Sequence, residues 1–223
     1  MIIAIDGPAG SGKSTVAKII AGKLHFRYID TGSMYRAVAW KSLLKNVDLS
    51  DEETVAEIAR NVKIDLVPEE GGQSVFVDGE NATNQLKQET ISRAAAVVAA
   101  QPMIRKIMTK KQRELGNRED VVMDGRDIGT VVFPNAEKKF FLDAEPKERG
   151  RRRFDELKTK KQEADVDLVT IVEQVKQRDH EDRTRKIAPL RQADDAISID
   201  TTHLDISQVV DQIMKEIGRV LHR

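Results

Sequence analysis

The sequence contains no cysteine, and this absence excludes a large group of functions. Without cysteine there are no disulfides, no thiolate nucleophile and no zinc site built on cysteine ligands. The four histidines, His25, His180, His203 and His222, are scattered and form no HExxH-type pair. The chemistry of this protein therefore rests on charged side chains, hydroxyl groups and the backbone.

The sequence also lacks a charge excess and a long apolar run. Its 37 Lys and Arg residues balance 37 Asp and Glu residues, whereas a generic nucleic-acid or membrane binder usually has a basic excess. No apolar run approaches the roughly 20 residues that span a bilayer. The first residues, MIIAID, are typical of a strand rather than of a secretory signal. We expect a cytoplasmic monomer without nucleic-acid or membrane partners.

Short apolar runs alternate with segments of helical spacing along most of the chain. We expect strands at residues 2–5, 26–29, 121–123, 139–142 and 196–199, and helices at residues 15–24, 31–44, 48–57, 89–100, 102–115, 146–161, 168–186 and 206–221. We expect the 48–57 helix to be capped by Ser50, with Glu53 three residues later. The repeated strand–helix units predict an α/β domain with a parallel sheet flanked by helices.

Residues 62–85 have a different pattern. Residues 62–67 and 74–78 alternate apolar and polar side chains and are separated by a glycine-containing turn, which predicts an antiparallel hairpin with one exposed face. We interpret about 60–90 as a small insert on the parallel-sheet core.

Residues 7–15 read GPAGSGKST, a complete GxxxxGK[ST] phosphate-binding motif between an expected strand and an expected helix. Its glycines let backbone N–H groups wrap a phosphate chain, and the helix adds its positive N-terminus. Lys13 would reach the outer phosphates, the Ser14 hydroxyl would hold Mg²⁺, and Asp124 would help to orient the ion or its water. An ordinary glycine-rich turn, and a solvated strand-end acid for Asp124, are the alternatives. The predicted ATP-binding residues of the loop are Gly7, Pro8, Ala9, Gly10, Ser11, Gly12, Lys13, Ser14 and Thr15.

Arginine is abundant beyond this loop, at positions 36, 105, 126, 149, 151, 152, 153, 178, 183 and 185. A kinase whose acceptor is itself a phosphate needs fixed guanidinium groups, because donor and acceptor repel each other. Such an acceptor is largely a dianion at pH 7, so no dedicated general base is required. Arg178, Asp182 and Arg185 would share one helix face and could grip phosphate and ribose. A solvated helix with local ion pairs is the alternative.

Four segments together resemble the bacterial cytidylate kinases in order and spacing over nearly the whole chain. They are IDGPAGSGKST at 5–15, DTGSMYR at 30–36, DGRDIGTVVFP at 124–134 and RDHEDRTRKIAPL at 178–190. The resemblance implies Mg²⁺-dependent transfer of the γ-phosphoryl group of ATP to CMP or dCMP.

The resemblance also implies a P-loop NTPase fold with a mobile lid and an enlarged nucleotide-monophosphate-binding insert that contains the small antiparallel sheet. The single domain of residues 1–223 then divides into three parts. They are a core of about 1–30, 116–147 and 187–223, an acceptor-binding region of about 31–115, and a lid of about 148–186.

Site roles follow from the same resemblance. It implies that Thr31, Arg36 and Arg126 lie near the acceptor phosphate, Arg105 and Asp127 face the cytosine, Arg178 and Asp182 hold the ribose, and Arg185 lies between base and phosphate. Arg149 and Arg153 would begin the lid over ATP, and Lys13, Arg126 and Arg185 would be catalytic. The family pattern also has a serine against the cytosine, where this sequence has Ala96; Ser92 is a nearby hydroxyl.

Other readings stay open at this point. The chain could be another small P-loop kinase that acts on a different nucleotide or a small hydroxylated metabolite, or an ATP-dependent binding module without an acceptor. A GTPase is disfavoured because no NKxD motif is present. RNA binding by the 147–161 basic run is weakened by its interleaved acids and by Phe154 being the only aromatic residue nearby.

Overall fold

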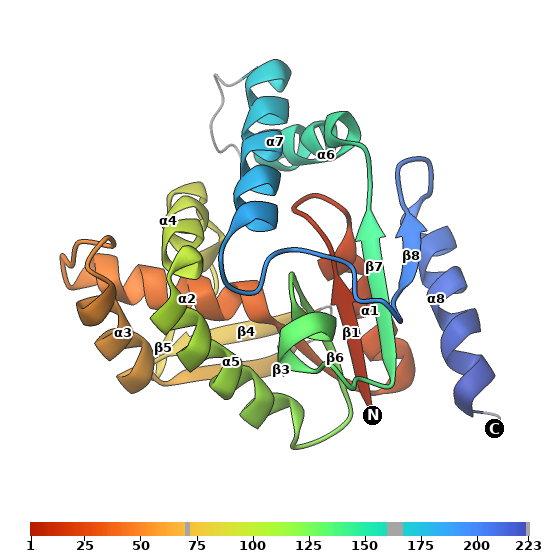
Figure 1. Cartoon of the computed structure of the whole chain (residues 1–223), viewed down its shortest axis with the longest axis horizontal. Coiled ribbons are helices and arrows are strands. Elements are labelled where there is room, and N and C mark those ends of the chain that lie inside the picture. Colours follow the sequence, from red (N-terminus) through yellow and green to blue (C-terminus); the bar gives the residue numbers. More distant parts are fainter. Residues whose placement is uncertain (70–71, 160–166, 222–223) are drawn as a thin grey trace.

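The computed structural model describes residues 1–69, 72–159 and 167–221 and contains two sheets. The larger is parallel with the order β2-β6-β1-β7-β8, and the smaller is antiparallel with the order β3-β4-β5 (Figure 1). The strands of the larger sheet are β1 (Ile2–Asp6), β2 (Arg27–Asp30), β6 (Val121–Gly125), β7 (Lys138–Asp143) and β8 (Ile197–Asp200), and those of the smaller are β3 (Ile64–Glu69), β4 (Gly72–Val77) and β5 (Glu80–Asn81). The predicted α/β class and the antiparallel hairpin are confirmed.

Helices connect these strands. They are α1 (Lys13–Leu24), α2 (Thr31–Leu44), α3 (Glu52–Asn61), α4 (Glu89–Ala100), α5 (Pro102–Gly116), α6 (Pro146–Thr159), α7 (Leu168–Thr184) and α8 (Ile206–Leu221), with a short 3-10 turn η1 (Gln85–Lys87) and a π-helical turn η2 (Ile128–Val132). No helix in the described ranges is long and apolar enough to cross a membrane.

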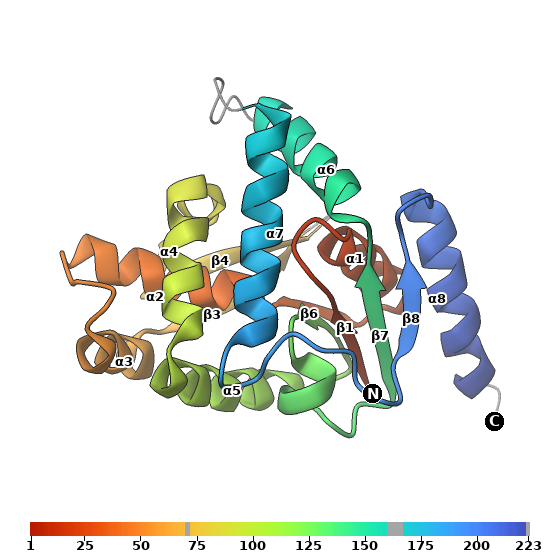
Figure 2. The same cartoon turned by 45° about the horizontal axis from the view of Figure 1, so that its top comes forward.

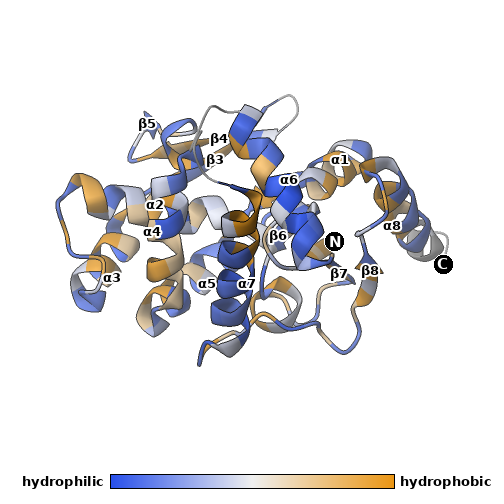
Figure 3. Cartoon of the chain, turned by 90° about the horizontal axis from the view of Figure 1, so that it is seen from above, coloured by the Kyte–Doolittle hydropathy of each residue, from blue (hydrophilic) through white to orange (hydrophobic). Residues whose placement is uncertain are grey.

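The larger sheet is covered by helices on both faces, and its strands alternate accordingly. Ile3 and Ile5 of β1 pack in one apolar cluster with residues of α1 and α8, whereas Ala4 belongs to a second cluster with residues of α2, α3, α4 and α5. In β6, Val122 joins the first cluster and Met123 the second. The continuous apolar runs in the sequence therefore reflect strands that are buried on both sides. Figure 3 shows α8 banded in blue and orange, as expected for a helix with one apolar face.

α6 and α7 project beyond the carboxyl end of β7 (Figures 1 and 2). Residues of α7 line a groove whose other wall is α4. The two projecting helices pack closely because Gly150 in α6 has no side chain. A Cβ atom there would overlap the side chain of Val172 in α7. This arrangement places one face of α7 above the carboxyl edge of the sheet.

Several local expectations differ from the structure. The cap of α3 is Asp51, not Ser50: the Asp51 carboxylate accepts from the Thr54 N–H (3.2 Å) and hydroxyl (2.6 Å), because it stands at the position directly before the first helical residue. α7 ends at Thr184 rather than at 186. After Thr184 the chain turns back, and the N–H of Leu190 donates to the carbonyl of Asp182.

Other differences concern short elements. The turns η1 and η2 and the two-residue β5 have too few residues for a sequence period and were not expected. Residues 70–71 of the predicted hairpin turn and the end of the predicted 146–161 helix lie outside the described residues, as does most of the predicted loop at 160–167.

We expect substitution by alanine to have opposite effects on stability at Gly7, in the loop between β1 and α1, and at Gly22, near the C-terminal end of α1. Gly7 has φ +152°, and an added Cβ would collide with the Leu142 carbonyl oxygen. Gly22 lies inside α1 with no atom within 4 Å of an added Cβ. We expect Gly7→Ala to lower the free energy of unfolding by at least about 2 kcal/mol, and Gly22→Ala to raise it by roughly 0.5–1 kcal/mol.

Urea denaturation of both variants checks this pair. A Gly7→Ala protein as stable as the unsubstituted chain would mean that the loop has room that the structure does not show.

Candidate active site

The loop between β1 and α1 has the backbone that its sequence predicts. Gly10 and Gly12 have φ +76° and +86°, conformations that glycine adopts without steric cost, and Gly12 is the N-cap of α1. The Lys13 ammonium is buried and donates to the carbonyl of Pro8 (3.2 Å). Burial, and then the nearby Arg126, lower the pKa of Lys13 well below its usual value. A phosphate chain in this loop would favour the protonated form again.

A carboxylate at the end of β6 faces the start of α1. Asp124 is buried and accepts from the Ser14 hydroxyl (2.6 Å) and from the Tyr28 hydroxyl (2.8 Å). Burial, and then the neighbouring Asp30, raise the pKa of Asp124, so a cation beside it would be stabilising. The sequence predicts that Ser14 and Asp124 serve the same ion, and in the structure their side chains are in hydrogen-bond contact.

The Ser14 hydroxyl and the Asp124 carboxylate suit Mg²⁺ better than they suit a metal ion whose ligands all come from the protein. Across the described residues, no three His, Cys, Asp or Glu side chains cluster in a way that could hold a metal. Mg²⁺ usually takes one or two protein oxygens and fills its other positions with water and substrate phosphates. A hydroxyl and one carboxylate at the mouth of a phosphate-binding loop meet that requirement.

The junction of β2 and α2 forms a second part of the site. Asp30 caps α2 by accepting from the Ser33 N–H (3.0 Å), and its other oxygen binds the Arg36 guanidinium (2.7 Å). Burial alone would raise the pKa of Asp30, but Arg36 and the Ser33 N–H hold it below its ordinary value. The Thr31 hydroxyl donates to the carbonyl of Asp124 (2.8 Å), which ties this junction to β6.

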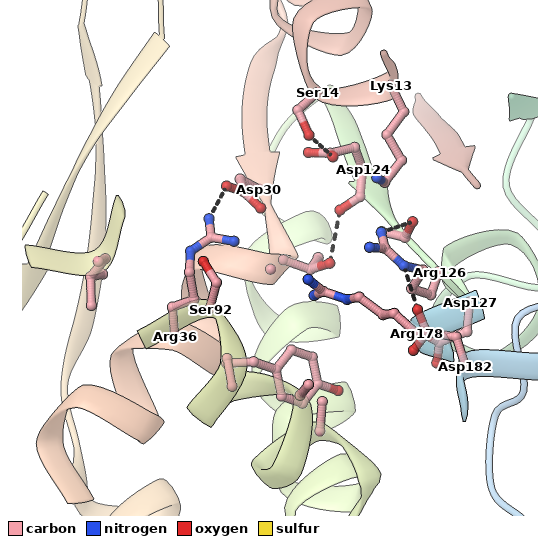
Figure 4. Close-up of a pocket in the computed structure, with 18 of the residues that line it drawn as sticks. Lys13, Ser14, Asp30, Arg36, Ser92, Asp124, Arg126, Asp127, Arg178 and Asp182 are labelled. Carbon is pink, nitrogen blue, oxygen red and sulfur yellow. Dashed lines mark hydrogen bonds and ion pairs between the residues drawn. The ribbon is translucent and has the colours of Figure 1, made fainter. Parts of the chain in front are cut away.

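The C-terminal half of α7 supplies Arg178 and Asp182, and the residue directly after the helix is Arg185. Asp182 accepts from Arg126 (3.0 Å) and from Arg185 (3.2 Å), and although burial would raise its pKa, these arginines and Arg178 keep it low. Burial, and next the adjacent Arg126, lower the pKa of Arg178. Figure 4 shows Arg126 and Arg178 directed into the same space as Lys13 and Asp124. Arg178 and Asp182 share a face of α7 as predicted; Arg185 lies one residue beyond the helix, and all three line the pocket rather than pointing to solvent.

The part of the pocket beside α4 and α5 contains a buried ion pair. Arg105 donates to Asp127 (2.6 Å) and to the carbonyl of Ala99 (3.1 Å), and an Arg185 nitrogen lies 3.8 Å from the second oxygen of Asp127. The Tyr35 hydroxyl, Arg105 Nε and one terminal nitrogen of Arg185 are buried without a hydrogen-bond partner in the described part of the chain. Polar atoms in this condition are uncommon and leave hydrogen-bonding capacity for a ligand. The opposite wall is made by small residues of α4, Ala95, Ala96 and Ala99, with Ser92 beside them.

A single pocket of about 340 Å³ joins these parts. It brings together most of the predicted site residues, namely Lys13, Ser14, Thr31, Arg36, Arg105, Asp124, Arg126, Asp127, Arg153, Arg178, Asp182 and Arg185. Sequence reasoning missed Asp30, Tyr35 and Lys18 among its lining residues. Asp30 and Tyr35 lie inside the DTGSMYR segment, so their neighbourhood to Arg36 was a signal that could have found them. Thr15 is exposed and does not line the pocket.

The two arginines expected over ATP lie in different environments. Arg153 lines the pocket and pairs with Glu89 at the start of α4 and with Glu156 (2.7 Å). Arg149 is 2% exposed, and its guanidinium donates to the carbonyls of Ala9 (3.1 Å) and Ala144 (2.7 Å) and to both oxygens of Asp179 in α7. Arg149 thus connects the phosphate-binding loop to α7.

Comparison with known proteins gives a consistent assignment. The family model described as cytidylate kinase matches residues 3–219. The cytidylate kinase of Bacillus subtilis (strain 168) is 47% identical over 215 residues, which are 96% of this chain and 95% of that protein. That of Caldanaerobacter subterraneus subsp. tengcongensis is 48% identical over 217 residues, or 97% and 94% of the two chains. A crystal structure of an uncharacterized protein from Eubacterium ventriosum ATCC 27560 has a TM-score of 0.51 at 16% identity, covers 98% of each chain and shares the fold alone.

The Arg149–Asp179 pair leads to a prediction about stability. Asp179→Asn removes the charge that balances a buried guanidinium, and we expect the free energy of unfolding to fall by roughly 3 kcal/mol. The matched control is Asp155→Asn, because Asp155 is exposed and pairs with Arg151 on the same helix (2.7 Å). Exposed pairs contribute little, so this variant should unfold at nearly the same urea concentration as the unsubstituted protein. Equal losses in the two variants would contradict the connecting role of Arg149.

Proposed function

This chain belongs to the cytidylate kinase family, and from that membership we propose that the pocket described above is where it works. The protein transfers the γ-phosphoryl group of ATP to CMP or dCMP, which gives ADP and CDP or dCDP. The observation that carries the assignment of the pocket is its continuity: one cavity runs from Lys13 and Ser14 at the phosphate-binding loop to Arg105 and Asp127 at the other end.

The loop of residues 7–15 is the proposed site for the triphosphate of ATP. Its glycines allow the backbone to follow the phosphate chain, and the N-terminus of α1 faces that chain. Ser14 and Asp124 would hold Mg²⁺, which when bound neutralises charge on the outer phosphates. Arg153 of α6 lines the same pocket and is proposed to contact the same phosphates. Arg149, whose donors are engaged by the loop and α7, is proposed to hold these elements rather than to touch ATP.

The acceptor phosphate is proposed to lie among Thr31, Arg36, Arg126 and Arg178. Two polyanions must approach within bonding distance here, and fixed guanidinium groups offset their repulsion. The acceptor oxygen belongs to a phosphate whose second pKa is about 6, so it is already deprotonated at neutral pH. The chain therefore needs no general base, and Lys13, Arg126 and Arg185 act by stabilising the charge of the transferring group.

The end of the pocket that contains Arg105 and Asp127 suits a cytosine base. The 4-amino group of cytosine donates a hydrogen bond that a carboxylate accepts, whereas uracil has a carbonyl oxygen at this position. Asp127 supplies the carboxylate, held in place by Arg105, and the partly unpaired donors of Arg105 and Arg185 suit the oxygen and nitrogen acceptors of the ring. With Ala96 in the wall, Ser92 is the hydroxyl on α4 available for a further contact. Asp182 and Arg178 are proposed to bind the ribose.

The assignment is tested by ADP release from purified protein with Mg-ATP and a panel of CMP, dCMP, UMP, AMP, GMP and dTMP. We expect strong stimulation by CMP and dCMP. Stimulation by another member alone would retain a small P-loop kinase and overturn the proposed base contacts. ATP binding without stimulation by any member would favour a binding module. Cytoplasmic location and a monomeric state stay predictions from the sequence.

Replacement of Lys13 tests the phosphate-binding loop. We expect Lys13→Ala to lower kcat by at least about a hundredfold, because the ammonium stabilises charge on the transferring phosphoryl group. Lys23→Ala is the control, since Lys23 is exposed at the other end of the same helix. Steady-state kinetics and thermal unfolding of both variants give the comparison. A Lys13→Ala enzyme with near-normal turnover would remove the loop from the mechanism.

Replacement of Asp127 tests base recognition. Asp127→Asn keeps the shape of the side chain but presents an amide donor, which opposes the amino group of cytosine and suits the 4-carbonyl of uracil. We expect the ratio of kcat/KM for CMP over UMP to fall by about tenfold or more, which corresponds to at least about 1.4 kcal/mol. An unchanged ratio in a folded variant would show that the base is read elsewhere.

A further inference from the structure

The carboxylate of Asp6 has no part in the contacts assigned so far, yet it is among the most deeply buried charged groups. Asp6 is the last residue of β1, directly before the phosphate-binding loop, and is 5% exposed. Its two oxygens accept from the backbone N–H groups of Ile128 (2.8 Å) and Gly129 (2.7 Å). A buried carboxylate is costly unless it is hydrogen-bonded, and these two donors supply that compensation.

Both donors belong to the first turn of η2, which follows Arg126 and Asp127 directly. The turn closes on Asp127, whose carbonyl accepts from the N–H groups of Val131 (2.9 Å) and Val132 (3.1 Å). The backbone of Asp6 also lies beside this segment, because Asp6 and Gly125 are paired neighbours in β1 and β6. The two residues between Gly125 and Ile128 are therefore held from both sides by Asp6, through the sheet and through its side chain.

The fit around this carboxylate is tight. A Cβ atom on Gly129 would stand 3.3 Å from an Asp6 oxygen and 3.1 Å from the Lys139 side chain. A π-helical turn is also a rare conformation that often occurs at functional sites. The turn is therefore specified by a carboxylate on one side and by the absence of a side chain on the other.

The surroundings of the Asp6 carboxylate are electrostatically unfavourable for its charged form. Burial raises the pKa of Asp6 to about 7, against the lowering effect of the two N–H donors; the charged groups facing it are Asp127, which raises the value further, and Arg126, which lowers it. An apolar residue at this strand end would avoid that cost. A role for the carboxylate itself is the simplest reason for its presence.

We propose that Asp6 is a positioning residue for the acceptor: by holding the N–H groups of Ile128 and Gly129, it sets Arg126 and Asp127 relative to the phosphate-binding loop. This inference rests on the proposed function, in which those two residues bind the acceptor phosphate and the base. Asp6 itself touches neither nucleotide.

The test is Asp6→Asn, in which one oxygen becomes an NH₂ group that cannot accept from a backbone N–H. We expect the Kd for CMP to rise about tenfold and the CMP/UMP preference to fall with it. The Kd for ADP alone should change less than twofold, because the side chain is isosteric and the loop backbone is retained. Calorimetric titration of each nucleotide gives both constants.

Gly129→Ala approaches the same contact from the other side and serves if Asp6→Asn does not fold. It should produce the same selective loss of CMP affinity. Asp51→Asn is the matched control, since it removes a carboxylate–backbone hydrogen bond at the start of α3 and should leave both affinities unchanged. Equal weakening of CMP and ADP, or unchanged CMP affinity in a folded variant, would overturn the positioning role. Failure of the unsubstituted protein to bind CMP would overturn the proposed function and this inference together.

Discussion

Repulsion among like charges in a small volume is the constraint on which the rest of this structure depends. Nine cationic side chains line one pocket of about 340 Å³: Lys13, Lys18, Arg36, Lys87, Arg105, Arg126, Arg153, Arg178 and Arg185. They remain together because carboxylates from other segments interleave with them, as in the pairs Arg36–Asp30, Arg126–Asp182 and Arg105–Asp127. The zero net charge of the chain and its strongly cationic pocket are thus compatible.

Two of the pocket's carboxylates, Asp30 and Asp124, belong to a row of aspartates at the ends of the parallel strands. β1, β2, β7 and β8 each end in aspartate, and β6 carries Asp124 just before its last residue. In a parallel sheet these ends share one edge, where ligands of open α/β folds bind. Each carboxylate there has its own partners: Asp30 binds Arg36 and caps α2, Asp124 binds Ser14, and Asp143 lies beside Arg149 (3.8 Å). One sheet edge therefore anchors the loop between β1 and α1, the junction of β2 and α2, and the base of α6.

Much of this arrangement could be predicted from sequence because its signals are local. The GPAGSGKST segment specifies its loop by glycine conformation, and the spacing of Arg178, Asp182 and Arg185 places them on one helix face. The environment of Arg149 could not be predicted, because it depends on Ala9 and on Asp179, which are 140 and 30 residues away. η2 was missed for the same reason: its first N–H groups are satisfied by Asp6, 122 residues earlier in the chain. The sequence of η2 contains no pattern that predicts the turn, because the carboxylate that stabilises it, Asp6, lies elsewhere in the chain.

The pairing of cations with carboxylates also bears on how the pocket can act quickly on its substrates. Catalysis by electrostatic stabilisation requires that dipoles and charges be oriented before the reaction, since reorientation during the reaction costs energy. The arginines around the proposed acceptor position are already oriented by Asp30 and Asp182, whose pKa values are held low by those same arginines. Both carboxylates are thus ionised at neutral pH, where the acceptor phosphate is largely a dianion. The carboxylates that offset the repulsion among the arginines therefore also orient the arginine side chains.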